Sequence, residues 1–105
     1  MTSTAALSAD PLRLRALRRA NEIRLERAQL KRRIAAGELS AAAVILDCPD
    51  AARSWPIAQV LASQRRWGQS KCTKLLRRVG VSERKPLGEL TTRQRRLLAA
   101  ALTSA

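Results

Sequence analysis

The sequence predicts an all-α protein in which a long basic helix precedes a compact helical domain. Nineteen alanines and sixteen leucines, with no tyrosine or phenylalanine, form a composition that favours helices over strands. The hydrophobic fraction of 46% is enough for one modest core, and 105 residues fit one small domain. Apolar residues also recur at helical spacing in several segments, which supports the same fold class.

The first helix is expected over residues 10–37, after a flexible leader formed by residues 1–9. Asp10 is a suitable N-cap, because its carboxylate can accept a hydrogen bond from a free amide of the first turn. Pro11 suits the first helical position, where its missing amide hydrogen costs nothing. Gly37 supplies a stop, since glycine readily takes the left-handed conformation that ends many helices.

The apolar stripe of this helix is thin. It contains Ile23, Leu30 and Ile34, and Arg27 interrupts it. We therefore expect the C-terminal half of the helix to dock on the remaining domain, residues 38–105, while the arginine-rich first half projects. A solvated helix without any partner is the alternative.

Two short buried helices are expected next. Residues 39–46 are nearly all apolar, Ser40 is a plausible N-cap, and Pro49 ends the segment because the residue before a proline resists helical geometry. Pro56 opens the second of these helices, and Trp55 is expected to cap the core just before it. The buried face of the second helix has i, i+3, i+4 spacing and comprises Ile57, Val60 and Leu61.

Two amphipathic helices are expected in the C-terminal third. The first follows the turn of residues 66–70 and ends at Gly80, after which Val81 can make a closing contact. A basic loop leads into the last helix, where Thr91 and Gln94 have the spacing of a capping box. The expected buried faces are Cys72, Leu75, Leu76 and Val79 in the first helix, and Leu97, Leu98, Ala101 and Leu102 in the second.

The net charge of +13 is large for a chain of this length, and it is unevenly distributed. Residues 13–33 carry nine bases and two acids, a net +7, and residues 65–96 carry eleven bases and two acids, a net +9. Residues 34–64 carry one base and three acids, a net −2. Self-repulsion of this size opposes compaction, so a polyanionic partner is the natural explanation.

Several other classes of protein are excluded by what the sequence lacks. No apolar run reaches the length of a transmembrane helix, the first helix has no broad apolar face for a membrane surface, and the first residues lack the pattern of a signal peptide. A cytosolic protein with reduced thiols is therefore expected. Cys48 and Cys72 lack a metal-binding spacing and there is no histidine, so neither metal nor cofactor is expected. Without histidine, and with Asp47 and Asp50 readily explained as parts of a polar turn, we do not expect an enzyme.

The stretch "RRWGQSKC", residues 65–72, has the features of a phosphate-binding turn. Gly68 allows close approach of a ligand to the backbone, and the free amides that open the following helix can bind an anion. Such contacts fix position on a nucleic-acid backbone and read no bases. Trp67 is expected to face the core, although stacking on a base or insertion as a wedge are alternatives.

Three arginines crowd the start of the last helix. Arg93, Arg95 and Arg96 lie at the positive end of a helix dipole, which is mildly unfavourable unless an anion binds there. The candidate DNA-binding residues of the whole chain are Arg65, Arg66, Gly68, Gln69, Ser70, Lys71, Lys74, Arg78, Arg84, Lys85 and Arg93.

Residues 57–98 as a whole resemble the integration host factor of actinobacteria, a small nucleoid-associated protein, with a weaker resemblance in the first helix. The resemblance departs from the family pattern at Arg65, where the family has proline, and at Trp67 and Gln69, where it has an aliphatic residue and lysine. Pro86 and Gly88 interrupt the family's basic run. The specific points of resemblance are Gly68 with Lys71, then Leu87, Leu90, Arg93, Gln94 and Arg95.

The resemblance implies a helix-two-turn-helix domain similar to that of a small-subunit ribosomal protein, with a long helix alongside. It also implies a monomer of the nucleoid that binds and bends double-stranded DNA with little sequence preference. The family's turn would correspond to residues 67–71, and its basic segment to residues 84–88. An RNA- or ribosome-associated protein that uses the same hairpin is the alternative. A module that docks an acidic partner or the DNA-processing machinery is a third reading.

Overall fold

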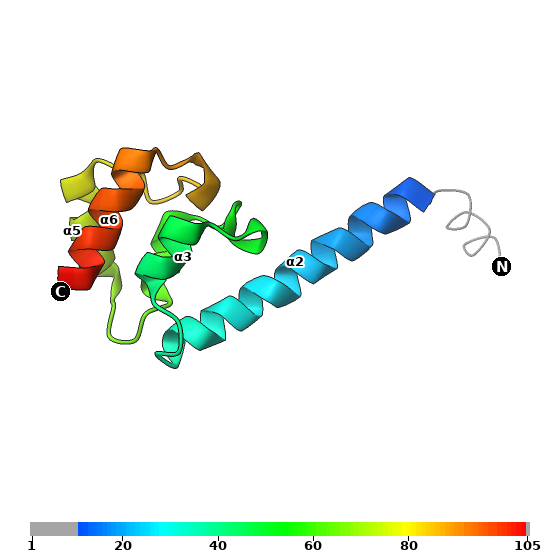
Figure 1. Ribbon diagram of the computed structural model, residues 1–105, viewed down its shortest axis with the longest axis horizontal. Helices are drawn as coiled ribbons and strands as arrows, with labels where there is room; N and C mark the ends of the chain where they lie inside the picture. The colour runs from blue at the N-terminus through cyan, green and yellow to red at the C-terminus, as the bar shows by residue number, and fades with distance from the viewer. Residues whose placement is uncertain (1–10, 105) are drawn as a thin grey trace.

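The computed structural model describes residues 11–104, and within them the elements of regular secondary structure are all helices (Figure 1). The expected leader, residues 1–9, and the expected N-cap, Asp10, lie outside the described residues. The predicted all-α class is confirmed, since β pairing in the described part is limited to one isolated bridge between Pro56 and Pro86. The elements are α2 Pro11–Ala35, α3 Ala41–Asp47, η1 Asp50–Ala52, α4 Ile57–Ala62, α5 Gln69–Val79, η2 Leu87–Glu89 and α6 Thr92–Ser104.

Helix α2 gives the molecule its elongated shape. Its 25 residues span about 37 Å at 1.5 Å per residue, and its N-terminal half extends well beyond the other helices (Figure 1). The described chain measures 57 × 27 × 23 Å and has a radius of gyration of 17.0 Å, against about 13 Å for a compact domain of this size. The C-terminal half docks on the body, where Ile34 is buried. The predicted docking is therefore confirmed.

Arg27 anchors α2 rather than interrupting its docking face. Its Nε donates to the carbonyl oxygen of Ala51 at 3.2 Å, and its Nη2 donates to the hydroxyl of Ser54. The aliphatic part of the arginine thus lies along the docked face while the guanidinium binds the η1 segment. The polar position that seemed out of place in the sequence is a specific link between α2 and the body.

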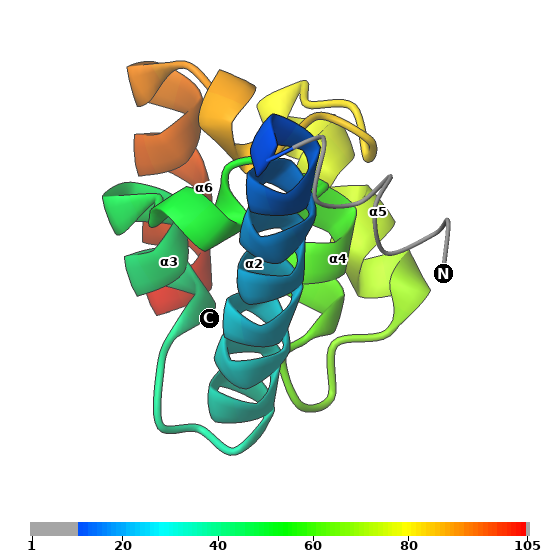
Figure 2. The same ribbon diagram turned by 90° about the vertical axis from the view of Figure 1, so that its right-hand side faces the viewer.

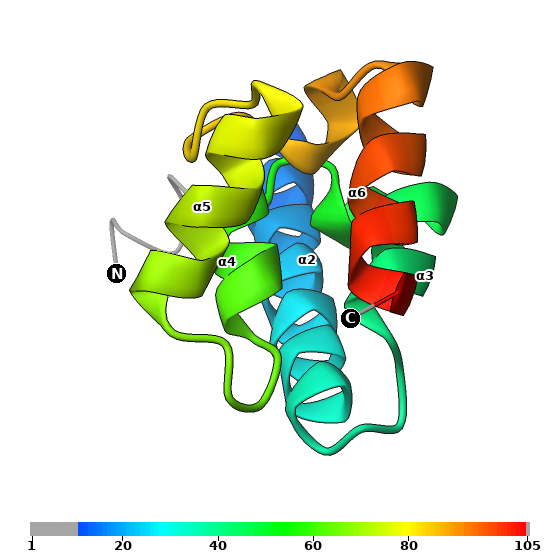
Figure 3. The same cartoon turned by 90° about the vertical axis from the view of Figure 1, so that its left-hand side faces the viewer.

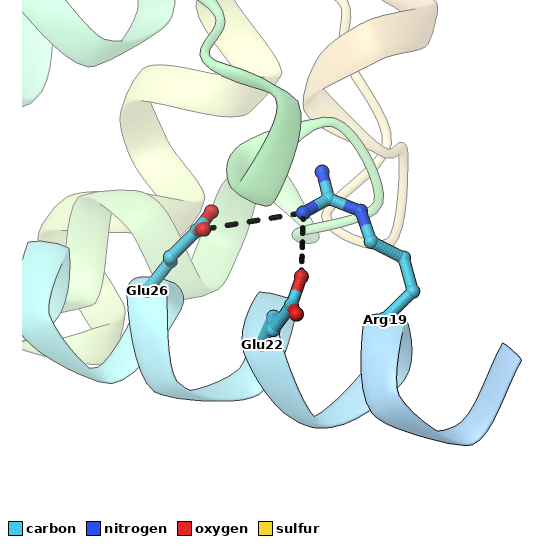
Figure 4. Close-up of polar contacts among 3 residues, drawn as sticks. All are labelled: Arg19, Glu22 and Glu26. Atoms are coloured by element: carbon cyan, nitrogen blue, oxygen red, sulfur yellow. Dashed lines mark hydrogen bonds and ion pairs between the residues drawn. The ribbon is translucent and has the colours of Figure 1, made fainter. Parts of the chain in front are cut away.

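The middle of α2 carries a small ion-pair network on its surface. Arg19 Nη1 lies 3.3 Å from a carboxylate oxygen of Glu22 and 4.0 Å from one of Glu26 (Figure 4). All three side chains are about half exposed, so the network contributes little to stability. Its main effect is local, because it places two negative charges in an otherwise basic helix.

The core lies between α3, α4, α5 and α6. Figure 3 shows α4 beside α5 and α3 beside α6, and contacts between α5 and α6 join the two pairs. Trp55, which was expected to cap the core just before α4, is a fully buried member of it. The core residues with the largest fully buried side chains are Trp55, Ile45, Ile57, Leu61, Leu76, Leu87, Leu98 and Val60.

Local capping interactions fix most helix ends as predicted. Ser40 Oγ accepts a hydrogen bond from the amide of Ala43 at 3.1 Å and caps α3. Thr91 and Gln94 form the predicted capping box of α6, with reciprocal bonds of 3.1 and 3.0 Å. Both Gly37 and Gly80 adopt a φ of 78° in the left-handed region and end α2 and α5, respectively.

The loop after α5 is held by backbone pairing with the start of α4. The amide of Ile57 donates to the carbonyl of Lys85 at 2.9 Å, and the amide of Ala58 donates to that of Glu83 at 3.1 Å. The amide of Leu87 in turn donates to the carbonyl of Trp55 at 2.9 Å. These bonds satisfy amides that α4 leaves free at its start, and they order the basic loop.

Two predictions for α6 are wrong. Leu97 is 43% exposed, because the face of α6 that packs on α3 is centred on Leu98 and Ala99. The prediction that Arg95 is placed to bind an anion is also wrong. Its Nη1 donates to the carbonyl of Ile45 at 3.1 Å and its Nε to that of Leu90 at 3.3 Å, so its guanidinium links α6 to α3.

Replacing Arg95 with alanine should therefore lower the free energy of unfolding by about 2 kcal/mol, because two charge-assisted hydrogen bonds disappear. Arg96→Ala removes the same charge from an exposed neighbouring position and should change stability by less than about 0.5 kcal/mol. Urea denaturation of both variants measures the difference. Equal losses would mean that Arg95 acts only through its charge.

Candidate nucleic-acid interface

The α4–α5 turn reverses the chain within a few residues. The amide of Trp67 donates to the carbonyl of Gln64 at 3.2 Å, and Gln64 Nε2 donates to that of Leu61 at 3.1 Å. Arg66 has a φ of 71°, a left-handed conformation that is uncommon for a residue with a side chain. The turn thus brings the chain directly from α4 into the first turn of α5.

The start of α5 differs from the starts of the other helices of the body. Its N-cap is Gly68, which has no side chain to accept a bond from the amides of residues 69–71. By contrast, side chains cap α3 and α6, and loop carbonyls bind the first amides of α4. Among α3 to α6, α5 alone therefore begins with neither a side-chain cap nor loop carbonyls that bind its first amides in the described structure.

Neither backbone strain nor packing requires glycine at position 68. Its φ of −79° is available to any residue, and a Cβ at this position would meet no atom within 4 Å. Gly80 differs in its positive φ, and Gly88 differs because a Cβ there would lie 3.2 Å from the carbonyl oxygen of Arg53. The space beside Gly68 is open to an external group, which could approach the backbone closely.

The Trp67 side chain packs against the hydrophobic core next to this turn and also contacts Lys71. The ring is half-buried and packs against the hydrophobic core, as predicted. Lys71 Nζ lies 4.4 Å from the centroid of the ring, within the range of a cation–π interaction. Trp67 thereby restricts where the Lys71 ammonium can lie near the open start of the helix.

The exposed face of α5 continues the positive charge away from the turn. Lys74, Arg77 and Arg78 follow Lys71 on the solvent side of the helix, and all four are exposed. A shallow groove runs along this face and is lined by Gln69, Ser70, Thr73, Lys74 and Arg77.

The remaining predicted residues divide into two places. Arg65 is exposed beside the C-terminal end of α2, where it lines a cavity together with Gln64 and residues 34–37 and 39–41. Arg84 and Arg93 are exposed at the other end of α5, where the basic loop meets α6 (Figure 3). Lys85 lies there too, but it is half-buried and its Nζ donates to Gln94 Oε1 at 3.2 Å. The two basic clusters are separated by α5, about 16 Å at its 11 residues.

The two cysteines are not joined to each other, and neither belongs to this surface. Cys72 is buried on the core side of α5, and desolvation by that burial raises the pKa of its thiol. A neutral, buried thiol is a poor nucleophile, so Cys72 serves as a core residue. Within residues 11–104, no group of three histidine, cysteine, aspartate or glutamate side chains is placed to hold a metal ion.

No helix within residues 11–104 is both long enough and apolar enough to span a membrane.

The fold consists of a long basic helix, α2, docked on a compact helical body. Within that body, α4 and α5 form a helical hairpin. No protein-family model matches the sequence, and no curated protein matches it. Among solved structures, the chain is similar to sIHF bound to an 8bp palindromic DNA, with a TM-score of 0.73 and 24% sequence identity. The similarity covers 81% of this chain and 98% of that one. The fold is therefore that of sIHF, an integration host factor.

Proposed function

We propose that this protein is a divergent member of the integration host factor family of actinobacteria and binds double-stranded DNA through backbone phosphates. The observation that carries the proposal is the uncapped start of α5. Free amides, the helix dipole, a glycine that neither backbone strain nor packing requires and the exposed cation Lys71 converge there. Each of these groups favours an anion, and a phosphate suits all of them at once.

The groups available at this surface favour binding without sequence preference. Backbone amides, lysines and arginines on α5 would contact phosphate oxygens, which are the same at every base pair. The candidate contacts from the α5 hairpin are Arg65, Arg66, Gly68, Gln69, Ser70, Lys71, Lys74 and Arg78, to which we add Arg77. We infer a role in architecture or packaging of the nucleoid rather than recognition of one operator.

Bending of the DNA follows from the second basic cluster. Arg84 and Lys85 lie in the loop after α5 and Arg93 lies in the first turn of α6, outside the α4–α5 hairpin. We propose that a duplex in contact with both clusters bends toward the protein, since phosphate contacts at two points can offset the cost of deformation. We propose that the protein acts as a monomer in this role and is a binding protein rather than an enzyme.

A structured RNA is the other polyanion that this hairpin could bind. The DNA in the sIHF structure favours the duplex reading, because that chain shares the fold. Fluorescence anisotropy with a random duplex, a structured RNA of equal length and a single strand tests the choice. Tighter binding of the duplex supports the proposal, and a clear preference for the RNA contradicts it.

Gly68→Ala should separate binding from folding. A methyl group here meets open space, and alanine is less favourable than glycine at an N-cap, so the free energy of unfolding should fall by no more than about 1 kcal/mol. The same methyl group would stand between the backbone and a phosphate, and loss of one amide–phosphate bond should weaken duplex binding about tenfold.

Gly80→Ala is the matched control. Its φ of 78° makes alanine unfavourable, so stability should fall by about 1–2 kcal/mol while duplex affinity of the folded protein stays near wild type. Thermal melting and anisotropy on both variants give the comparison. If Gly68→Ala binds DNA as the wild type does, no phosphate approaches the backbone at this turn.

A further inference from the structure

Helix α2 has an apolar face that points away from the body of the protein. Leu14, Leu17, Asn21, Leu25 and Ala28 follow one another at intervals of three and four residues and fall within an arc of about 80° on the helix. Leu17 is 51% exposed and Leu25 is 67% exposed. Single exposed leucines need no explanation, but a continuous stripe along a projecting helix does. We call these five residues the outer stripe.

The outer stripe plays no part in the fold. The residues by which α2 docks, among them Arg27, Leu30 and Ile34, are centred about 150° around the helix from the stripe. Figure 2 shows α2 in front of the other helices, so the side that faces away from them is open. Packing within the chain therefore does not account for the leucines.

Cations border the outer stripe on both sides. Arg24 and Lys31 lie along one edge, Arg18 lies along the other, and all three are exposed. An apolar stripe bordered by positive charge is complementary to a helix with leucines or similar residues on one face and acids beside them. Charge of this kind selects the partner, and the apolar contact supplies the affinity.

Two other occupants fit the face less well. A second copy of α2 would bring another net +7 from residues 13–33 against the first, which is strongly repulsive. Duplex DNA would gain nothing from the leucines, because its backbone offers no apolar face to bury them. We propose that the outer stripe of α2 docks an acidic amphipathic helix of a partner protein.

This proposal does not depend on DNA binding by the hairpin. The outer stripe lies on α2 and the hairpin joins α4 to α5, so one protein could hold DNA with its body and a partner with its projecting helix. A tether of this geometry would bring an acidic protein to the nucleoid.

The test uses the full chain and a fluorescent synthetic peptide of about 20 residues, with leucines at heptad positions a and d and glutamates at e and g. A scrambled peptide of identical composition controls for charge alone. We expect the amphipathic peptide to bind in anisotropy and the scrambled one to bind at least about tenfold more weakly. Equal binding of both peptides would overturn the proposal, since charge alone would then explain it.

The double variant Leu17→Gln with Leu25→Gln tests the stripe itself. It should fold normally, keep wild-type affinity for a random duplex, and lose about tenfold or more in affinity for the amphipathic peptide. Leu97→Gln, an equally conservative change at an exposed leucine of α6, should bind the peptide as the wild type does. The proposal fails if the double variant keeps its peptide affinity, if it loses duplex affinity, or if sedimentation shows a wild-type dimer that the variant cannot form.

Discussion

Raising the salt concentration from about 50 to about 200 mM should weaken binding to a random duplex about 10³-fold, if about six phosphates are contacted. The physical reason is counterion release, because every phosphate that a lysine or arginine neutralises frees a condensed cation from the DNA. The α5 hairpin and the exposed face of α5 carry Arg65, Arg66, Lys71, Lys74, Arg77 and Arg78, which is enough for a response of this size. Anisotropy titrations at four or five salt concentrations measure it.

The same titration on duplexes of different base composition provides the control for specificity. Phosphate contacts are the same on every sequence, so the curves should nearly coincide. A response to salt of less than tenfold over this range would mean that phosphate neutralisation does not dominate binding. Curves that diverge strongly between sequences would instead indicate direct contacts with base edges.

Trp55→Ala should lower the free energy of unfolding by about 3–5 kcal/mol. The side chain is fully buried among the core residues before α4, and alanine would leave a cavity that the surrounding helices cannot fill. Domains of this size are stable by about 5–15 kcal/mol, so the variant should be close to unfolding at ambient temperature. Urea denaturation followed by circular dichroism gives the value.

Trp55→Phe is the informative comparison. The indole Nε1 of Trp55 is buried and has no hydrogen-bond partner in the described structure. Phenylalanine keeps most of the buried volume and removes this unsatisfied donor, so the net loss should be only about 1 kcal/mol. A loss in Trp55→Phe as large as that in Trp55→Ala would show that the indole nitrogen does have a partner in solution.

Much of the fold could be predicted because its determinants are local. Ser40, Gly80 and the pair Thr91 and Gln94 act within four residues of themselves, so their spacing alone indicates the helix ends. The buried face of α5 followed in the same way from its clear periodicity.

The errors arose where distant parts of the chain interact. Arg95 binds the carbonyl of Ile45, fifty residues earlier, and Arg27 binds segments more than twenty residues later. No local pattern distinguishes such an arginine from one that faces a phosphate. The exposure of Leu97 likewise depends on how α6 is rotated against α3, which only the packed structure determines.

For the candidate interface, the sequence identified the turn and the glycine but not the reason why they stand out. The contrast between α5 and its neighbours depends on loop carbonyls that bind the first amides of α4. That contrast, and the open space beside Gly68, appear only in three dimensions. The position of Lys71 over the Trp67 ring is a further detail of this kind.

The central claim is that the start of α5 and its exposed face hold the phosphates of a duplex. The most direct test compares the slope of log Kd against log salt concentration for the wild type, for Lys71→Ala combined with Lys74→Ala, and for Arg24→Ala on α2. The double variant should lower the slope by about two, one for each phosphate that is no longer neutralised, while Arg24→Ala should keep the wild-type slope. An unchanged slope in the double variant, or an equal decrease per charge in Arg24→Ala, would contradict the claim, because binding would then follow net charge and not this surface.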